Sequence, residues 1–316
     1  MLFGQGSKSL GTIVAISSYA SYFWQPIMNL GNIFNNFINN IAYLERIFET
    51  MDEPVTVKDA ENAVKMPEIR GEVTFDHVNF SYDESKQILK DVSFTVKPGE
   101  SVALVGPTGA GKSTIVNLIS RFYNVNGGRV LIDGQDISQV AIHSLREQMG
   151  IMMQDSFIFS GDIEDNIRYG KLDATLEEIV NASKTVCADE FISKMPDRYQ
   201  TEVRERGSML SQGQKQLISF ARTLLSDPAI LILDEATSSI DVQTEKALQT
   251  GLNAMLKGRT SFIIAHRLST IRNCDKIMYI DNGGIMESGT HDELMAKKGY
   301  YYKLYTAQLD EVQKAG

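Results

Sequence analysis

The pattern of apolar and polar positions divides the chain at about residue 70. Before that point, residues 10–44 contain no charged side chain, and apolar residues recur three and four positions apart between residues 30 and 44. Such spacing places apolar side chains on one face of a helix, so we predict a long helix with an apolar stripe. At about 1.5 Å per residue, residues 10–30 are long enough to cross a bilayer.

The pattern leaves two interpretations of this helix. It is either buried inside a soluble domain or a transmembrane helix that continues into the cytosol. Its Ser, Tyr and Gly content is typical of a helix that packs against other helices, and no other segment is suited to cover the stripe. Residues 50–70 differ, because they are polar and charged, contain Pro54 and Pro67 and show no apolar period. We expect a linker there.

From residue 71 onward, short apolar runs alternate with helical stretches. Residues 73–80 and 92–96 fit half-buried strands. Later runs are continuously apolar, and such runs between helices indicate a parallel sheet that is covered on both faces. These runs lie at residues 101–105, 150–153, 229–233 and 261–265.

Polar residues follow each of the four continuous runs. In an open parallel sheet, ligands bind at the carboxyl ends of the strands, because those ends meet at one edge. We therefore expect one site built from residues at four strand ends. These residues are Gly106, Gln154, Asp234 with Glu235, and His266.

Composition excludes several classes of protein. The 316 residues are 43% hydrophobic and 22% charged, so the chain can bury a core, and disorder is excluded as its main state. With a net charge of −9, the chain as a whole lacks the excess of basic residues that is typical of a nucleic-acid-binding protein. Cys187 and Cys274 are too few for a disulfide framework or a thiolate zinc site.

The most specific motif follows the run at residues 101–105. Residues 106–114 read GPTGAGKST and match the phosphate-binding loop pattern G-x-x-x-x-G-K-[ST]. Glycine lets backbone N–H groups approach phosphate closely, and the helix that follows directs its positive end at the anion. Lys112 supplies a cation for the β- and γ-phosphates, and Ser113 supplies a hydroxyl for Mg²⁺. The loop residues are Gly106, Pro107, Thr108, Gly109, Ala110, Gly111, Lys112, Ser113 and Thr114.

Two further motifs are weaker on their own. Asp234 can hold Mg²⁺ opposite the phosphate loop, and Glu235 can orient and deprotonate an attacking water. An Asp-Glu pair after a strand, however, often only marks the place where a buried strand reaches the surface. Residues 210–214, LSQGQ, precede an apolar helix. Ser211 is a plausible N-cap and Gly213 permits close approach of an anion, although an ordinary helix start explains the same letters.

Together and in this order, the motifs resemble the nucleotide-binding domain of an ABC transporter over about residues 70–310. The resemblance implies that the chain binds and hydrolyses ATP with Mg²⁺. It assigns Gln154 to the Q-loop, Asp241 to the D-loop and His266 to the H-loop, and it makes Tyr82 the aromatic residue that stacks on adenine.

The resemblance also implies a role for each site residue. Lys112, Glu235 and His266 are expected to be catalytic, and Ser113, Gln154 and Asp234 to hold Mg²⁺, partly through water. Tyr82, the loop residues 106–114, Gln154 and Asp234 are expected to bind ATP. The residues expected to contact the ATP of a partner chain are Leu210, Ser211, Gln212, Gly213, Gln214 and Asp241.

The implied fold class is α/β. A P-loop NTPase core of parallel sheet with flanking helices is expected to carry an antiparallel β subdomain and a helical signature subdomain, preceded by a long transmembrane-type helix. Residues 1–49 are expected to be the C-terminal part of a transmembrane domain, because residues 43–49 resemble the junction after the sixth transmembrane helix of exporter half-transporters. Residues 50–70 are the expected linker, and residues 71–316 the nucleotide-binding domain.

The partners follow from the same resemblance. We expect a dimer with a second half-transporter, identical or different, together with transmembrane helices that this chain lacks, membrane lipid and no nucleic acid. The implied function is ATP-dependent export of a substrate across the cell membrane, with the nucleotide-binding domain on the cytoplasmic side.

Departures from the family pattern and two alternatives stay open. Gln212 and Arg204 stand where this family and its exporters usually have Gly, and residues 239–241 read SID instead of ALD. These changes leave open whether both sites of a dimer hydrolyse ATP. The alternatives are a soluble ABC ATPase that is not coupled to transport and a regulatory module that binds ATP without hydrolysing it.

Overall fold

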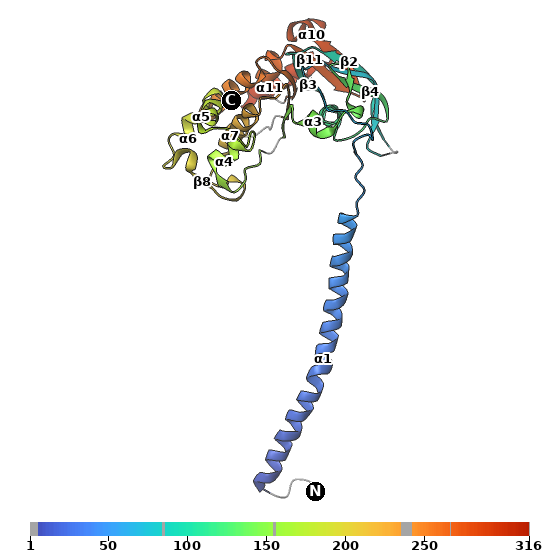
Figure 1. Cartoon of the computed structure of the whole chain (residues 1–316), viewed down its shortest axis with the longest axis vertical. Coiled ribbons are helices and arrows are strands. Elements are labelled where there is room, and N and C mark those ends of the chain that lie inside the picture. Colours follow the sequence, from blue (N-terminus) through green and yellow to red (C-terminus); the bar gives the residue numbers. More distant parts are fainter. Residues whose placement is uncertain (1–5, 84–85, 154–155, 235–241, 266, 316) are drawn as a thin grey trace. The chain divides into compact units, whose positions relative to one another are not determined.

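The structure of the chain is a computed structural model that describes residues 6–83, 86–153, 156–234, 242–265 and 267–315 (Figure 1). It divides the chain into two units, residues 1–56 and 57–316. Each unit is a separate body of contacts, and the second contains the expected nucleotide site.

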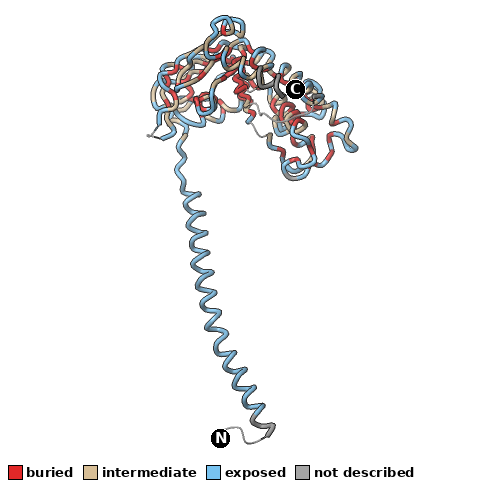
Figure 2. The backbone as a smooth tube through the Cα atoms, turned by 180° about the vertical axis from the view of Figure 1, so that it is seen from behind, coloured by how far each residue is buried: buried red, intermediate tan, exposed pale blue. Residues whose placement is uncertain are grey.

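The first unit is built around one helix, α1 (Gly6–Met51). The helix is exposed from residue 10 to its end, and its large apolar side chains are exposed with it (Figure 2). By hydropathy, none of the helices that the structure describes is both long and apolar enough to cross a membrane. The expected transmembrane span at residues 10–30 does not meet this criterion, because its Ser, Tyr, Asn and Gln residues lower the mean hydropathy of a helix that is otherwise long enough.

A six-stranded sheet forms the centre of the second unit. Its strand order is β12-β11-β3-β10-β9-β6, and neighbouring strands are parallel except for β11 and β12. All four continuous apolar runs of the sequence are strands of this sheet, which confirms the predicted parallel core. The strands are β3 (Ser101–Val105), β6 (Met149–Met152), β9 (Ile230–Asp234), β10 (Thr260–Ile264), β11 (Lys276–Asp281) and β12 (Gly284–Gly289).

Alternate residues of each central strand enter two different hydrophobic cores. In β3, Val102 and Leu104 face one core, and Ala103 and Val105 face the other. Successive side chains of a strand point to opposite faces, so a strand that is covered on both sides must be apolar at every position. This double burial explains why these runs are continuous in the sequence rather than alternating.

The first core lies between this sheet and an antiparallel sheet of order β2-β1-β4-β5. The two predicted half-buried strands, at residues 73–80 and 92–96, belong to β1 and β2, so both are confirmed. Helices α2 and α3 pack into the same core. The elements are β1 (Val73–Ser81), β2 (Gln87–Val96), α2 (Lys112–Ile119), β4 (Gly127–Ile132), β5 (Gln135–Asp136) and α3 (Ile142–Arg146).

The second core is covered by helices from the segment between β6 and β9 and by helices that follow β9. Helices α5, α7 and α10 each begin with a capping box, in which a Thr or Ser side chain and a Glu or Gln three residues later satisfy free backbone N–H groups. The elements are β7 (Gly161–Asp162), α4 (Ile163–Arg168), α5 (Leu176–Thr185), α6 (Asp189–Ile192), β8 (Glu202–Val203), α7 (Gln212–Leu225), α8 (Val242–Leu256), α9 (Leu268–Asn273), α10 (His291–Lys297) and α11 (Tyr300–Ala315).

Much of the expected linker packs against the second unit. Met66 and Ile69 are buried, and Val64 forms a parallel bridge with Val140. These isolated apolar residues have no period along the sequence, because each enters the core from an extended chain rather than from a regular element. Residues 57–72 therefore form a strap on the domain.

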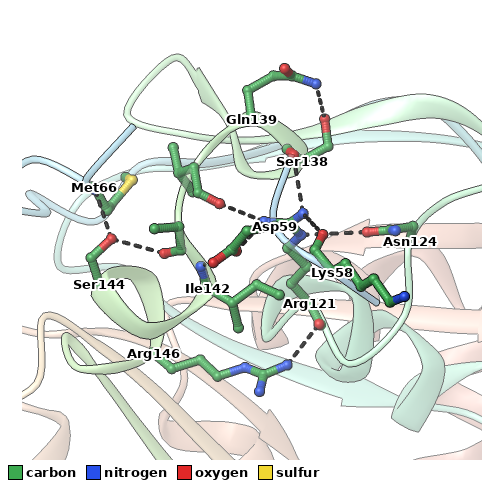
Figure 3. Close-up of polar contacts among 12 residues, drawn as sticks. Lys58, Asp59, Met66, Arg121, Asn124, Ser138, Gln139, Ile142, Ser144 and Arg146 are labelled. Atoms are coloured by element: carbon green, nitrogen blue, oxygen red, sulfur yellow. Dashed lines mark hydrogen bonds and ion pairs between the residues drawn. The ribbon is translucent and has the colours of Figure 1, made fainter. Parts of the chain in front are cut away.

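A buried arginine anchors the start of this strap. Arg121, just after α2, donates hydrogen bonds to the carbonyl oxygens of Lys58, Ser138 and Val140 and to the side chain of Asn124 (Figure 3). Its side chain is 3% exposed, so the carbonyls replace water as its hydrogen-bond partners. The arginine thereby joins the strap, the end of α2 and the turn before α3.

A carboxylate anchors the end of the strap. Asp133 accepts hydrogen bonds from the backbone N–H groups of Arg70, Gly71 and Glu72, with shortest distances of 2.6, 3.2 and 2.8 Å.

Replacing Asp133 with Ala should lower the free energy of unfolding by about 1–3 kcal/mol, because these N–H groups lose their acceptor. Urea unfolding followed by far-ultraviolet circular dichroism would measure the loss. The control is Glu68→Ala on the exposed face of the strap, which should change stability by less than about 0.5 kcal/mol; equal midpoints for the two variants would contradict the anchoring role.

Candidate functional site

The phosphate loop lies between β3 and α2, as its motif requires. Gly106 has φ 138°, and a Cβ there would lie 2.0 Å from the carbonyl oxygen of Ile280 in β11. Gly111 has φ 108°, and a Cβ there would lie 2.9 Å from a methyl group of Leu89. Any other residue would therefore strain the backbone and collide with a neighbouring strand. The two glycines let the chain turn sharply from the strand end into the helix, so that α2 begins at Lys112.

Lys112 is folded back onto its own loop. Its Nζ donates hydrogen bonds to the carbonyl oxygens of Gly106 and Pro107, at 2.8 Å each. Burial lowers the pKa of this amine, and the negative charge of Asp234 opposes that change. The cation is thus held in the loop by neutral acceptors that a phosphate group can replace.

Asp234 and Ser113 offer oxygen atoms at the same edge of the sheet. Asp234 is the last residue of β9 and is paired with Ile264 at the end of β10, while Ile264 is paired with Leu104 of β3. The side chain of Ser113 is exposed in the first turn of α2. A carboxylate and a hydroxyl are hard oxygen ligands of the kind that Mg²⁺ takes when it is bound together with substrate phosphates, so these two residues fit that ion.

The structure brings part of the predicted site together. Strands β3, β6, β9 and β10 all end at one edge, so the predicted convergence of four strand ends is confirmed. Asp234 is the polar residue that the structure describes at the end of β9. The residues predicted at or beyond the other strand ends, Gln154, Glu235, Asp241 and His266, lie outside the described residues.

Tyr82 lies beside the helix that follows the phosphate loop. The residue is 48% exposed, and its ring makes edge-to-face contacts with Phe80 and Tyr123, at centroid distances of 4.8 and 4.9 Å. Its hydroxyl lies 3.1 Å from Oγ1 of Thr114, and Asn117 donates a long hydrogen bond of 3.5 Å to it. The tyrosine is therefore fixed by contacts on several sides while part of its surface stays open to a ligand.

Two of these neighbours were not predicted from the sequence. Asn117 lies one turn after Thr114 on α2, so helical spacing was the signal that could have found it. Tyr123 follows the helix, and only the fold shows that it contacts Tyr82. Residues 107–110 of the phosphate loop also line an open hollow of about 230 Å³, to which Lys86 and Lys90 contribute.

The predicted signature residues form the start of α7. Ser211 is its N-cap, as predicted: its Oγ accepts a hydrogen bond from the N–H of Gln214 at 3.2 Å, and Gln214 Oε1 accepts one from the N–H of Ser211 at 2.9 Å. Gly213 and Leu210 are buried, whereas Ser211 and Gln212 are exposed. The N-terminal end of α7, with its partial positive charge, therefore lies at the surface beside the exposed side chain of Ser211.

Comparison with known proteins identifies the domain. Residues 89–238 match the ABC transporter family. The chain is 52% identical over 300 residues to an ABC transporter ATP-binding protein of Bacillus subtilis, covering 95% of this chain and 50% of that protein. It is 44% identical to a fatty acid ABC transporter ATP-binding/permease protein of Mycobacterium tuberculosis (96% and 48% covered) and 41% identical to an ATP-dependent lipid A-core flippase of Syntrophus aciditrophicus (97% and 51%).

A solved structure supports the same assignment. A bacterial Atm1-family ABC exporter with ATP bound matches with a TM-score of 0.78 and 40% identity, over 97% of this chain and 54% of that one. The chain thus spans about half the length of the relatives it matches. Because it contains a strand–loop–helix phosphate site and matches these relatives, the chain carries an ATP-binding ATPase domain of the ABC transporter family.

Proposed function

We propose that this chain binds Mg-ATP at residues 106–114 and hydrolyses it in a dimer with a second half-transporter, which drives export of a substrate across the cell membrane. The observation that carries the proposal is the convergence of Lys112, Ser113 and Asp234 at one edge of the parallel sheet. The relatives support the export step, since several of them are ATP-binding/permease proteins.

Nucleotide binding begins with an exchange of partners at Lys112. Its Nζ leaves the carbonyl oxygens of Gly106 and Pro107 and binds the β- and γ-phosphates. The new contact is charge-assisted on both sides, so it is stronger than the hydrogen bonds to neutral carbonyls that it replaces. Backbone N–H groups of the loop and of the first turn of α2 bind the same phosphates.

Hydrolysis needs a positioned water next to these groups. Ser113, Asp234 and Gln154 would hold Mg²⁺, which would supply positive charge to the phosphate oxygens. Glu235 directly follows Asp234 in the chain, and we assign it the role of the base that accepts a proton from the attacking water. His266 follows the end of β10, and we assign it a contact with the γ-phosphate.

The signature residues act on the ATP of the partner chain. Ser211 exposes its side chain at the positive end of α7, next to the exposed Gln212. In a head-to-tail dimer each ATP would contact the phosphate loop of one chain and residues 210–214 of the other. Asp241 would line the same interface. Residues 1–49, with the exposed apolar stripe of α1, would pack against transmembrane helices and lipid, and the nucleotide-binding domain would lie on the cytoplasmic side.

Replacing Glu235 with Gln should stop turnover while ATP binding persists, because an amide cannot accept the proton of the attacking water. The loss of a positioned base typically costs about 10²–10⁴ in rate. Phosphate release and nucleotide binding would be measured in parallel, with Glu177→Gln on the exposed face of α5 as the control. Undiminished phosphate release in Glu235→Gln would refute this role, and a parent chain that binds ATP without releasing phosphate would favour the regulatory binding module.

Replacing Tyr82 with Ala should weaken ATP binding by about 1–3 kcal/mol, since base stacking on an aromatic ring contributes about that much. Tyr82→Phe should lose much less, because it keeps the ring and removes only the contact of the hydroxyl with Thr114. A fluorescent ATP analogue titrated into each variant would measure the affinities. Equal affinities for the parent and the Ala variant would show that Tyr82 only packs against Phe80 and Tyr123.

The shared-site arrangement predicts complementation between two inactive chains. Lys112→Ala damages the phosphate loop, and Ser211→Arg places a bulky cation where the γ-phosphate of the partner's ATP would approach. Each homodimer should be nearly inactive, whereas a mixed dimer has one site with an intact loop and an intact signature. Its phosphate release should therefore reach up to about half that of the parent. Mixed dimers would be isolated with two affinity tags, and mixed dimers as inactive as the single variants would contradict a head-to-tail site.

A further inference from the structure

A charged side chain in the last turn of α7 makes hydrogen bonds to neighbouring segments of the chain. This residue, Arg222, is half-buried. Its Nε donates to the carbonyl oxygen of Asn166 at 2.8 Å, its Nη2 to Oδ1 of Asn166 at 3.1 Å, and its Nη1 to the carbonyl oxygen of Phe157 at 3.0 Å. The guanidinium therefore bridges α7, α4 and the segment that precedes α4.

Asn166 extends this bridge along the preceding segment. The residue is 2% exposed, and its Oδ1 also accepts the N–H of Phe159 at 2.9 Å. Its Nδ2 donates to the carbonyl oxygens of Phe159 and Asp162, at 2.9 Å each. Through one buried amide, Arg222 is connected to the backbone at three points between residues 157 and 162.

Two aromatic rings cover the guanidinium. The central carbon of Arg222 lies 5.5 Å from the ring centre of Phe159 and 5.8 Å from that of Tyr169, and the two rings are 4.8 Å apart. Rings in this position attract a cation and exclude water from its hydrogen bonds. The described acceptors of Arg222 are neutral oxygen atoms, whose geometry fits the planar fork of an arginine better than the single ammonium of a lysine.

The bridge connects two regions that have separate roles in the proposed function. Phe157 is three residues after Gln154, the residue expected to contact Mg²⁺ and phosphate. Ser211 is eleven residues before Arg222, about 16 Å along the same helix. One end of the bridge is thus attached to the chain segment that follows Gln154, and the other end to the helix that offers Ser211.

We propose that Arg222 is a positioning residue that joins the segment after Gln154 to α7 and so holds the Ser211 end of α7 where it can serve the partner's ATP. This inference rests on the proposed function. The packing of α4 on α7 does not rest on the guanidinium alone, because buried apolar side chains of both helices, among them Ile167 and Phe220, share the second core. Arg222→Met should therefore fold while losing the three hydrogen bonds.

The test places two substitutions in one chain and leaves the other chain intact. In a mixed dimer of the parent with Lys112→Ala, only the site with the parent's phosphate loop can work, and it uses the signature of the variant chain. Adding Arg222→Met to the Lys112→Ala chain leaves the phosphate loop and Gln154 of the parent chain unchanged. It alters only the α7 that reaches across. We expect phosphate release at saturating ATP at least fivefold below that of the Lys112→Ala mixed dimer.

Matched variants define what counts as support. Arg146→Met in the same background is the control, because Arg146 also donates to two backbone carbonyls, of Ser120 and Arg121, and lies 4.7 Å from the ring centre of Phe122, yet it belongs to α3. It should leave the rate unchanged. Arg222→Lys should restore only part of the rate, and Ser211→Arg should abolish it. A rate for the Arg222→Met dimer equal to that of the Lys112→Ala dimer would overturn the proposal.

Hydrogen exchange gives a second readout that needs no turnover. In Glu235→Gln chains with Mg-ATP, residues 212–216 should gain protection when Arg222 is present and should not when it is Met, while residues 106–114 gain protection in both. Equal protection of residues 212–216 in the two variants would overturn the role of Arg222. If the Lys112→Ala mixed dimer is itself inactive, the one-site premise of the proposed function fails, and this exchange difference then decides on Arg222 alone.

Discussion

The register of the parallel strands is the constraint on which the site depends. Leu104 of β3 is paired with Ile264 of β10, and Ile264 is paired with Asp234 of β9, so the three strands end side by side. The phosphate loop and the carboxylate of Asp234 are more than a hundred residues apart in sequence, and this pairing brings them to one edge. The charge of Asp234 then acts on the amine of Lys112. A sheet buried on both faces resists slippage, because a shift by one residue would exchange the two cores.

Each layer around the sheet contributes a different part of the chemistry. The layer with α2 and the antiparallel sheet supplies the phosphate loop and Tyr82, and the strap of residues 57–72 is attached to that same layer through Arg121 and Asp133. The opposite layer supplies α7, whose capping box presents Ser211. The bridge of Arg222 lies in this opposite layer, where it joins the segment after β6 to α7.

Helix α1 differs physically from the rest of the chain. Its large apolar side chains are exposed, because contacts within the first unit do not cover them. Exposed apolar surface of this extent is typical of an interaction site. The chain spans about half the length of its relatives, which include ATP-binding/permease proteins. The stripe is therefore best understood as a surface that other helices cover in the proposed half-transporter.

The sequence by itself determined the elements and the chemistry of the phosphate site, because both depend on local features. Burial on both faces makes a strand continuously apolar, so β3, β6, β9 and β10 could be predicted. The phosphate-loop motif has glycine, lysine and serine at set spacings, so residues 106–114 could be predicted as well. Ser211 could be predicted as an N-cap for the same reason. Only the tertiary structure decided that residues 57–72 pack on the domain, that Tyr123 and Asn117 contact Tyr82, and that Arg222 reaches Phe157. These contacts join segments that are distant in sequence and leave no period or motif, since each depends on where the fold places two unrelated stretches of chain.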